Sequence, residues 1–130
     1  MNERRFSFYA ALLLIAGVSL GAFGAHGLND VLDTAYRVEI YEKAVFYHFV
    51  HALGLLLVSL LATTGVISRD IEKRVGLALV FGVVIFSGSL YLLAITEIKW
   101  LGAITPIGGA LFIVAWAYLA YCLGLSKTSS

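Results

Sequence analysis

The chain has 130 residues, of which 61% are hydrophobic and 13% charged, and its mean hydropathy is +0.94. A soluble domain is nearer half apolar and a quarter charged, so this composition excludes the ordinary soluble globular class. The net charge of +1 does not indicate nucleic acid as a partner.

Charged residues are absent from four windows, 6–29, 44–67, 75–96 and 100–126. About 20 apolar residues in a helix cross the roughly 30 Å hydrocarbon core of a bilayer, and lipid-exposed backbone must satisfy its own hydrogen bonds. The sequence therefore predicts an all-α, four-transmembrane-helix bundle. It forms one integral membrane domain over 1–130, with spans at about 6–28, 44–67, 75–96 and 105–125.

The first segment carries three glycines on one helical face. Gly17, Gly21 and Gly24 fall together at 3.6 residues per turn, and 17–21 is a GxxxG pattern. In lipid, helices associate through close packing, and glycine lets their backbones approach. We expect this face to be a helix seam, within the chain or between copies. His26 lies on the opposite side, close to the membrane boundary.

The stretch 29–43 is the longest polar part of the chain. Asn29, Asp30 and Asp33 are residue types that favour the N-cap of a helix. The pattern predicts either a short interfacial helix or a forward extension of the second span. We expect the charged side chains of this stretch, Arg37 among them, to be solvated.

The second segment opens with two histidines, His48 and His51. An ionisable side chain inside a span is costly, so its presence there is a functional-site hypothesis. Tyr41 and several small residues lie within about 60° of His48 on a helical wheel, which predicts a small, polar stripe facing the bundle interior. At least one ring is expected to bond to His26, to Tyr91 or to a held water. We group His26, His48, His51 and Tyr91 as the candidate polar cluster.

Lysine and arginine are unevenly distributed between the two ends of the spans. Six of the nine lie in the termini and the charged loop 68–74, and three lie in the other two connectors. Cytoplasmic segments carry the excess of Lys and Arg. Both termini are therefore predicted to face the cytoplasm.

The third and fourth segments carry further packing signals. Gly82 and Ser89 share a stripe of the third segment that suits contact with a neighbouring helix. In the fourth segment, Thr105 and Pro106 fit an N-cap followed by proline at the first helical position, where the missing N–H costs nothing. We expect the fourth span to begin there, with 101–104 dipping into the outer leaflet. The alternative is a continuous helix kinked at Pro106.

Four motifs together resemble a known family: 21–27 (GAFGAHG), 47–53 (YHFVHAL), 86–91 (FSGSLY) and 105–109 (TPIGG). Their order over nearly the whole chain is similar to an uncharacterised family of small bacterial inner-membrane proteins that includes the transmembrane protein 256 group (domain of unknown function 423). The resemblance implies a multi-pass protein of the plasma (inner) membrane with unknown biochemistry. His26 and His51 match histidines of the family pattern.

Three functions remain open. The favoured interpretation is a non-enzymatic accessory or interaction bundle without a cofactor, because packing in lipid requires only helix seams and small polar stripes. Its partners would be the lipid bilayer and a second copy or another membrane protein. The first alternative is a metal or haem site with His26, His48 and His51 as ligands, since bundles build such sites between facing helices. The second is a transporter or channel for a small solute or protons, relayed by histidine. No motif indicates a familiar class of enzyme.

Overall fold

The structure is a computed structural model, and it describes residues 4–126. Its elements in order are α1 (Arg5–His26), α2 (Ala35–Thr63), α3 (Arg69–Gly82), the π-helical turn η1 (Val83–Ser87), α4 (Gly88–Thr96) and α5 (Leu101–Ser126). α3, η1 and α4 are continuous and form one span. The described residues contain four helices long and apolar enough to cross a membrane and no strand, so the predicted all-α, four-span bundle is confirmed.

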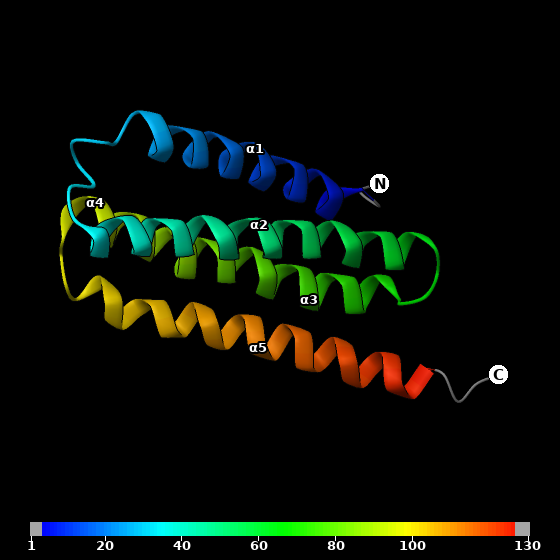
Figure 1. Cartoon of the computed structure of the whole chain (residues 1–130). Helices are drawn as coiled ribbons and strands as arrows, with labels where there is room; N and C mark the ends of the chain where they lie inside the picture. The colour runs from blue at the N-terminus through cyan, green and yellow to red at the C-terminus, as the bar shows by residue number, and fades with distance from the viewer. Residues whose placement is uncertain (1–3, 127–130) are drawn as a thin grey trace.

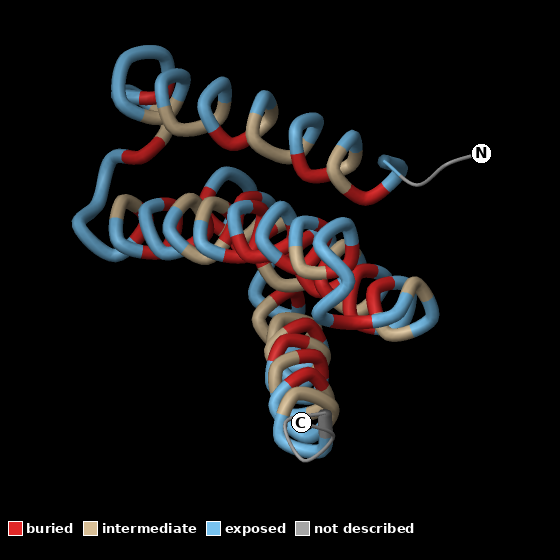
Figure 2. The backbone as a smooth tube through the Cα atoms, turned by 90° about the vertical axis from the view of Figure 1, so that its right-hand side faces the viewer, coloured by how far each residue is buried: buried red, intermediate tan, exposed pale blue. Residues whose placement is uncertain are grey.

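Successive spans run antiparallel (Figure 1). The turn 64–68, which joins α2 to α3, lies at one end of the bundle, together with the first residue of α1 and the last residue of α5. The connectors 27–34 and 97–100 lie at the opposite end. α2 and the α3–α4 span form the middle of the bundle, and α1 and α5 lie on opposite sides of this pair (Figures 1 and 2). Four crossings place both ends of the described chain on one side of the membrane. That this side is the cytoplasm stays a prediction.

Side-chain caps determine where two of the helices begin. Thr34 Oγ1 accepts a 3.2 Å hydrogen bond from the backbone N–H of Arg37, so α2 begins at Ala35, well before the charge-free window. Residues 35–43 of the polar stretch are therefore a forward extension of the second span, and 29–34 belong to the connector. Ser68 Oγ accepts a 3.2 Å bond from the backbone N–H of Ile71 and starts α3 in the same way.

The predicted start of the fourth span at Pro106 is wrong, because α5 begins at Leu101 and Pro106 lies inside it. The proline ring removes the N–H that would bond to the carbonyl of Gly102. The helix is already wound at this point: the backbone N–H groups of 101, 102 and 103 donate to the carbonyls three residues earlier, at 2.9–3.2 Å. Thr105 Oγ1 also donates to the Leu101 carbonyl at 3.3 Å. The stretch 101–104 is thus the first turn of α5.

The buried residues of the core lie mainly on the two central spans, α2 and α3–α4 (Figure 2). Leu55 of α2 and Leu79 of α3 are fully buried. α1 is more peripheral, with Phe6, Ala10 and Gly17 as its buried residues. Its other sides expose large apolar groups, which is the pattern expected of a helix whose outer surface is covered by lipid.

Candidate functional site

His48 joins three spans at the centre of the bundle. The residue is 3% exposed, and its Nε2 lies 2.7 Å from the backbone carbonyl of Leu13 in α1. A carbonyl oxygen only accepts, so Nε2 carries the hydrogen, and Nδ1 accepts from the Tyr91 hydroxyl of α4 at 2.8 Å. Both ring nitrogens are therefore used within the fold. The predicted bond between a histidine and Tyr91 is present.

Two tyrosines extend this contact toward the connector end of the bundle. The Tyr41 hydroxyl donates a 2.5 Å bond to the Leu20 carbonyl of α1. The Tyr41 and Tyr91 rings meet edge to face, with centroids 5.2 Å apart. Tyr41, His48 and Tyr91 thus form a continuous polar and aromatic cluster that ties α1 to α2 and α4. Tyr41 lies on the predicted stripe, but no feature of the sequence distinguishes it from the packing residues.

His51 lies on the same helix but faces α5. Its Nδ1–H donates to the Tyr47 carbonyl one turn earlier, at 2.9 Å. Its ring stacks on Phe112, with centroids 3.5 Å apart and planes at 13°, and lies 5.9 Å from the Trp116 ring. His51 is therefore surrounded by aromatic side chains, while the bonds of His48 go to α1 and α4.

His26 does not join the other histidines. It is exposed at the end of α1, and lies about 20 Å along the helix axis from Leu13, where His48 attaches. Within residues 4–126, no group of three or more His, Cys, Asp and Glu side chains is placed to hold a metal ion. The candidate cluster is thus divided into a joined pair, His48 and Tyr91, and two separate histidines.

The glycines of α1 lie along its contact with α2. A Cβ at Gly17 would lie 3.3 Å from the Phe49 ring, and one at Gly24 would overlap the Tyr41 ring. Gly21 is looser, because the nearest atom of α2 would be 3.6 Å from its Cβ, an ordinary van der Waals separation. A side chain is thus blocked by the Tyr41 ring at Gly24, would be tight at Gly17, and has room at Gly21.

Gly82 and Ser89 lie along the contact with α5. A Cβ at Gly82 would collide with the Phe112 ring. Ser89 Oγ lies 2.5 Å from Thr105 Oγ1, so a hydroxyl pair links α4 to α5. Gly82 and Ser89, the two residues named on the stripe of the third segment, therefore both lie against the fourth span.

The π-helical turn η1 lies between Gly82 and α4. A π turn inserts one residue into a helix and changes the direction of the side chains on either side of it. Ser87, at its end, is fully buried and donates a 2.8 Å bond to the Ala44 carbonyl of α2. On the other side, a Cβ at Gly108 of α5 would overlap the backbone of Phe86. The turn therefore sits between two neighbouring spans at close range.

Arg37 is buried, contrary to the expectation that it is solvated. Its Nε and Nη2 donate to the carbonyls of Ala94 and Ile95 at 2.7 and 2.6 Å, and Nη1 lies 3.2 Å from Asp33 and 3.4 Å from Glu97. These carbonyls end α4 and have no partners within the helix, so the guanidinium caps that helix. The contact joins residues more than fifty positions apart, so no local signal in the sequence could have shown it.

Glu72 is the other buried charged side chain of note. Its Oε1 accepts a 3.0 Å bond from Arg69, while Oε2 is the one buried side-chain oxygen or nitrogen within residues 4–126 that has no hydrogen-bond partner. Glu72 lies in the first turn of α3, where the exposed amide groups of the helix favour a negative charge. This placement explains why a carboxylate is tolerated at the end of the span.

A family model described as "Protein of unknown function (DUF423)" matches residues 20–109. The chain belongs to this family. A UPF0382 membrane protein of Staphylococcus epidermidis (strain ATCC 12228 / FDA PCI 1200) is 49% identical over 114 residues, covering 88% of this chain and 90% of that protein. UPF0382 membrane protein YwdK of Bacillus subtilis (strain 168) is 43% identical over 113 residues, covering 85% and 89%. No solved structure matches the chain significantly.

The DUF423 match includes α2, the α3–α4 span and the first turns of α5, together with the end of α1. It therefore contains the Tyr41, His48 and Tyr91 cluster, the Arg37 cap and the π turn. The names of the related proteins describe membrane proteins and state no activity. The chain is accordingly a multi-pass membrane protein of unknown biochemical activity, with the lipid bilayer as its surroundings.

Proposed function

We propose that the protein is a non-enzymatic accessory protein of the plasma (inner) membrane that acts by binding another membrane protein, a second copy of the chain included. One observation carries the proposal: the polar side chains between the spans are engaged with one another and with backbone carbonyls. Apart from one oxygen of Glu72, every buried side-chain nitrogen and oxygen within residues 4–126 has a partner. Buried polar groups of this kind stabilise and orient helices in lipid.

The surroundings of the two buried histidines support a structural role for them. The bonds of His48 go to a carbonyl and a tyrosine hydroxyl, and His51 bonds to a carbonyl and stacks on aromatic rings. A catalytic histidine is typically oriented by a carboxylate and placed beside a nucleophile. A metal ligand needs a ring nitrogen that is free of such bonds, and both ring nitrogens of His48 are engaged within the fold.

The test combines three measurements on one preparation purified from membranes. We expect no stoichiometric metal by elemental analysis, no Soret band in the absorption spectrum, and no proton flux in proteoliposomes above that of empty vesicles. A stoichiometric metal or a Soret band would overturn the proposal in favour of a cofactor site. A proton flux that His48→Gln abolishes, and that Tyr121→Phe on the exposed surface leaves intact, would overturn it in favour of transport.

The interaction itself is tested by photo-crosslinking in intact membranes. A photoreactive residue is placed in turn at Phe8 of α1, Leu57 of α2 and Ile113 of α5, which all point away from the core. We expect one of these faces to give a discrete protein adduct that the others lack. Diffuse adducts with lipid from all three positions would contradict a protein partner.

A further inference from the structure

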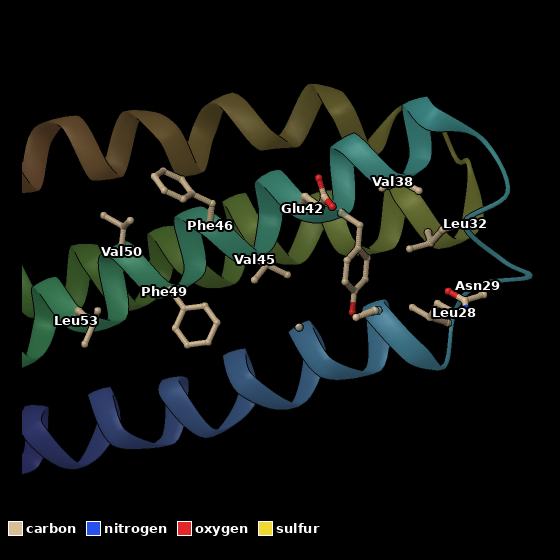
Figure 3. Close-up of a pocket in the computed structure, with 14 residues that line it drawn as sticks. Leu28, Asn29, Leu32, Val38, Glu42, Val45, Phe46, Phe49, Val50 and Leu53 are labelled. Carbon is tan, nitrogen blue, oxygen red and sulfur yellow. The ribbon is translucent and has the colours of Figure 1, made fainter.

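A groove of about 680 Å³ lies between α1 and α2 near the connector end of the bundle (Figure 3). Its volume falls in the range of about 300–1,000 Å³ that is typical of small-molecule sites. Figure 3 shows Val45, Phe49 and Leu53 on the side of α2 that faces α1, with Leu53 toward one end and Asn29 at the other. Phe46, Val50 and Leu53 line the groove and are exposed on the outer surface of the bundle, so a ligand can enter from the bilayer.

Small residues on α1 create this groove. Gly21 and Ala25 line it, and a Cβ at Gly21 would still lie 3.6 Å from the nearest atom of α2. The space is therefore wider than close helix contact requires. It is narrowed at Gly24, where the Tyr41 ring covers the glycine and bonds to the Leu20 carbonyl.

The part of the groove between Glu42 and Leu53 matches one leaflet of a membrane in length and level. From Glu42 to Leu53, α2 advances about 16 Å at 1.5 Å per residue, close to half of a hydrocarbon core of roughly 30 Å. The charge-free window of α2 begins at Ala44, so Glu42 and Lys43 mark the boundary with the headgroups. The side chains from Val45 to Leu53 then lie at the depth of the acyl chains.

Glu42 gives the groove its charge. It is the one charged residue that lines the groove, it is exposed, and it makes no ion pair within residues 4–126. An ammonium group supplies three N–H donors, and its bond to a carboxylate is charge-assisted. Lys43 follows directly, is also exposed, and carries the opposite charge. Lys43 does not line the groove, so Glu42 alone places a charge at its boundary end.

We propose that this groove binds one phospholipid with a primary ammonium headgroup, a phosphatidylethanolamine. One acyl chain lies along Val45, Phe49 and Leu53, and the ammonium group bonds to the Glu42 carboxylate. The proposal does not depend on the accessory function and can be tested separately.

The test is lipid binding to the delipidated full-length protein, followed by native mass spectrometry. The protein is titrated with phosphatidylethanolamine or with phosphatidylcholine of identical acyl chains, whose quaternary ammonium has no N–H to donate. We expect one retained molecule of phosphatidylethanolamine with a Kd about fivefold below that of phosphatidylcholine, equivalent to about 1 kcal/mol. Glu42→Gln should remove this preference. Glu39→Gln, an exposed acid on the same helix that does not line the groove, should keep it.

Filling the groove supplies the second arm of the test. Gly21→Leu should reduce binding of both lipids, while Gly124→Leu, where a Cβ would meet no atom within 4 Å, should leave binding unchanged. Ala25→Phe fills the same groove from an exposed position and replaces Gly21→Leu if that variant does not fold. Equal affinity for the two lipids, or a preference that survives Glu42→Gln, would refute the headgroup assignment. Wild-type binding in a folded groove-filling variant would refute the site. A dimer that these variants dissociate would identify a second copy as the occupant.

Discussion

A single methyl group on α1 should separate the close part of the α1–α2 contact from the open part. Gly24→Ala places a Cβ inside the space of the Tyr41 ring. The ring cannot move freely, because its hydroxyl bonds to the Leu20 carbonyl at 2.5 Å and its edge packs on Tyr91. Gly21→Ala makes the same change three residues earlier, where the new atom would be 3.6 Å from its nearest neighbour in α2.

The structure gives the expected magnitudes. Overpacking a well-filled contact costs about 1–3 kcal/mol, and a tyrosine hydroxyl pushed away from its acceptor costs about another 1 kcal/mol. Replacing a helical glycine by alanine returns roughly 0.5–1 kcal/mol. Gly24→Ala should therefore lower the free energy of unfolding by about 1–3 kcal/mol, and Gly21→Ala should leave it unchanged or raise it slightly.

Thermal unfolding in detergent, followed by circular dichroism, measures the difference. The two variants share one helix and one substitution, so effects on α1 itself largely cancel. The midpoint of Gly24→Ala should fall below that of wild type, and the midpoint of Gly21→Ala should not. Equal midpoints for the two variants would show that the Tyr41 ring does not pack on Gly24, and the close contact between α1 and α2 would be refuted.

Three further predictions follow from the same structure. Tyr91→Phe leaves a buried imidazole nitrogen without its donor and should lower the free energy of unfolding by about 1–3 kcal/mol. Tyr121→Phe, at a residue 65% exposed, should not lower it. Equal losses in the two variants would argue against the buried hydrogen bond. Arg37→Met removes the cap of α4 and should lower the free energy of unfolding by roughly 1–3 kcal/mol in chemical denaturation. Lys43→Met is the exposed control. An unchanged midpoint for Arg37→Met would place the guanidinium in solvent. A reporter fused after Ser130 should be active only in its cytoplasmic form, and periplasmic activity would invert the orientation.

The number and type of spans were determined by the sequence alone. Four uncharged windows, each long enough to cross a bilayer, leave a helix as the only backbone that satisfies its own hydrogen bonds in lipid. The hydrogen bond between His48 and Tyr91 could also be predicted from the sequence, because a buried imidazole needs a partner and a tyrosine on a neighbouring span can supply one. These inferences depend on the bilayer as a solvent and on periodicity along one helix.

Only the tertiary structure decided which span each polar group meets. His48 and His51 are one turn apart on α2, yet the first bonds to α1 and α4 and the second stacks on α5, because α2 has neighbours on several sides. The charge on Arg37 predicted a solvent-exposed side chain, but the carbonyl groups at the C-terminal end of α4, more than fifty residues away in the sequence, bind its guanidinium inside the fold. Periodicity along a helix gives the direction of a side chain within that helix. It carries no information about which neighbouring helix lies in that direction, since that depends on how all four spans pack together.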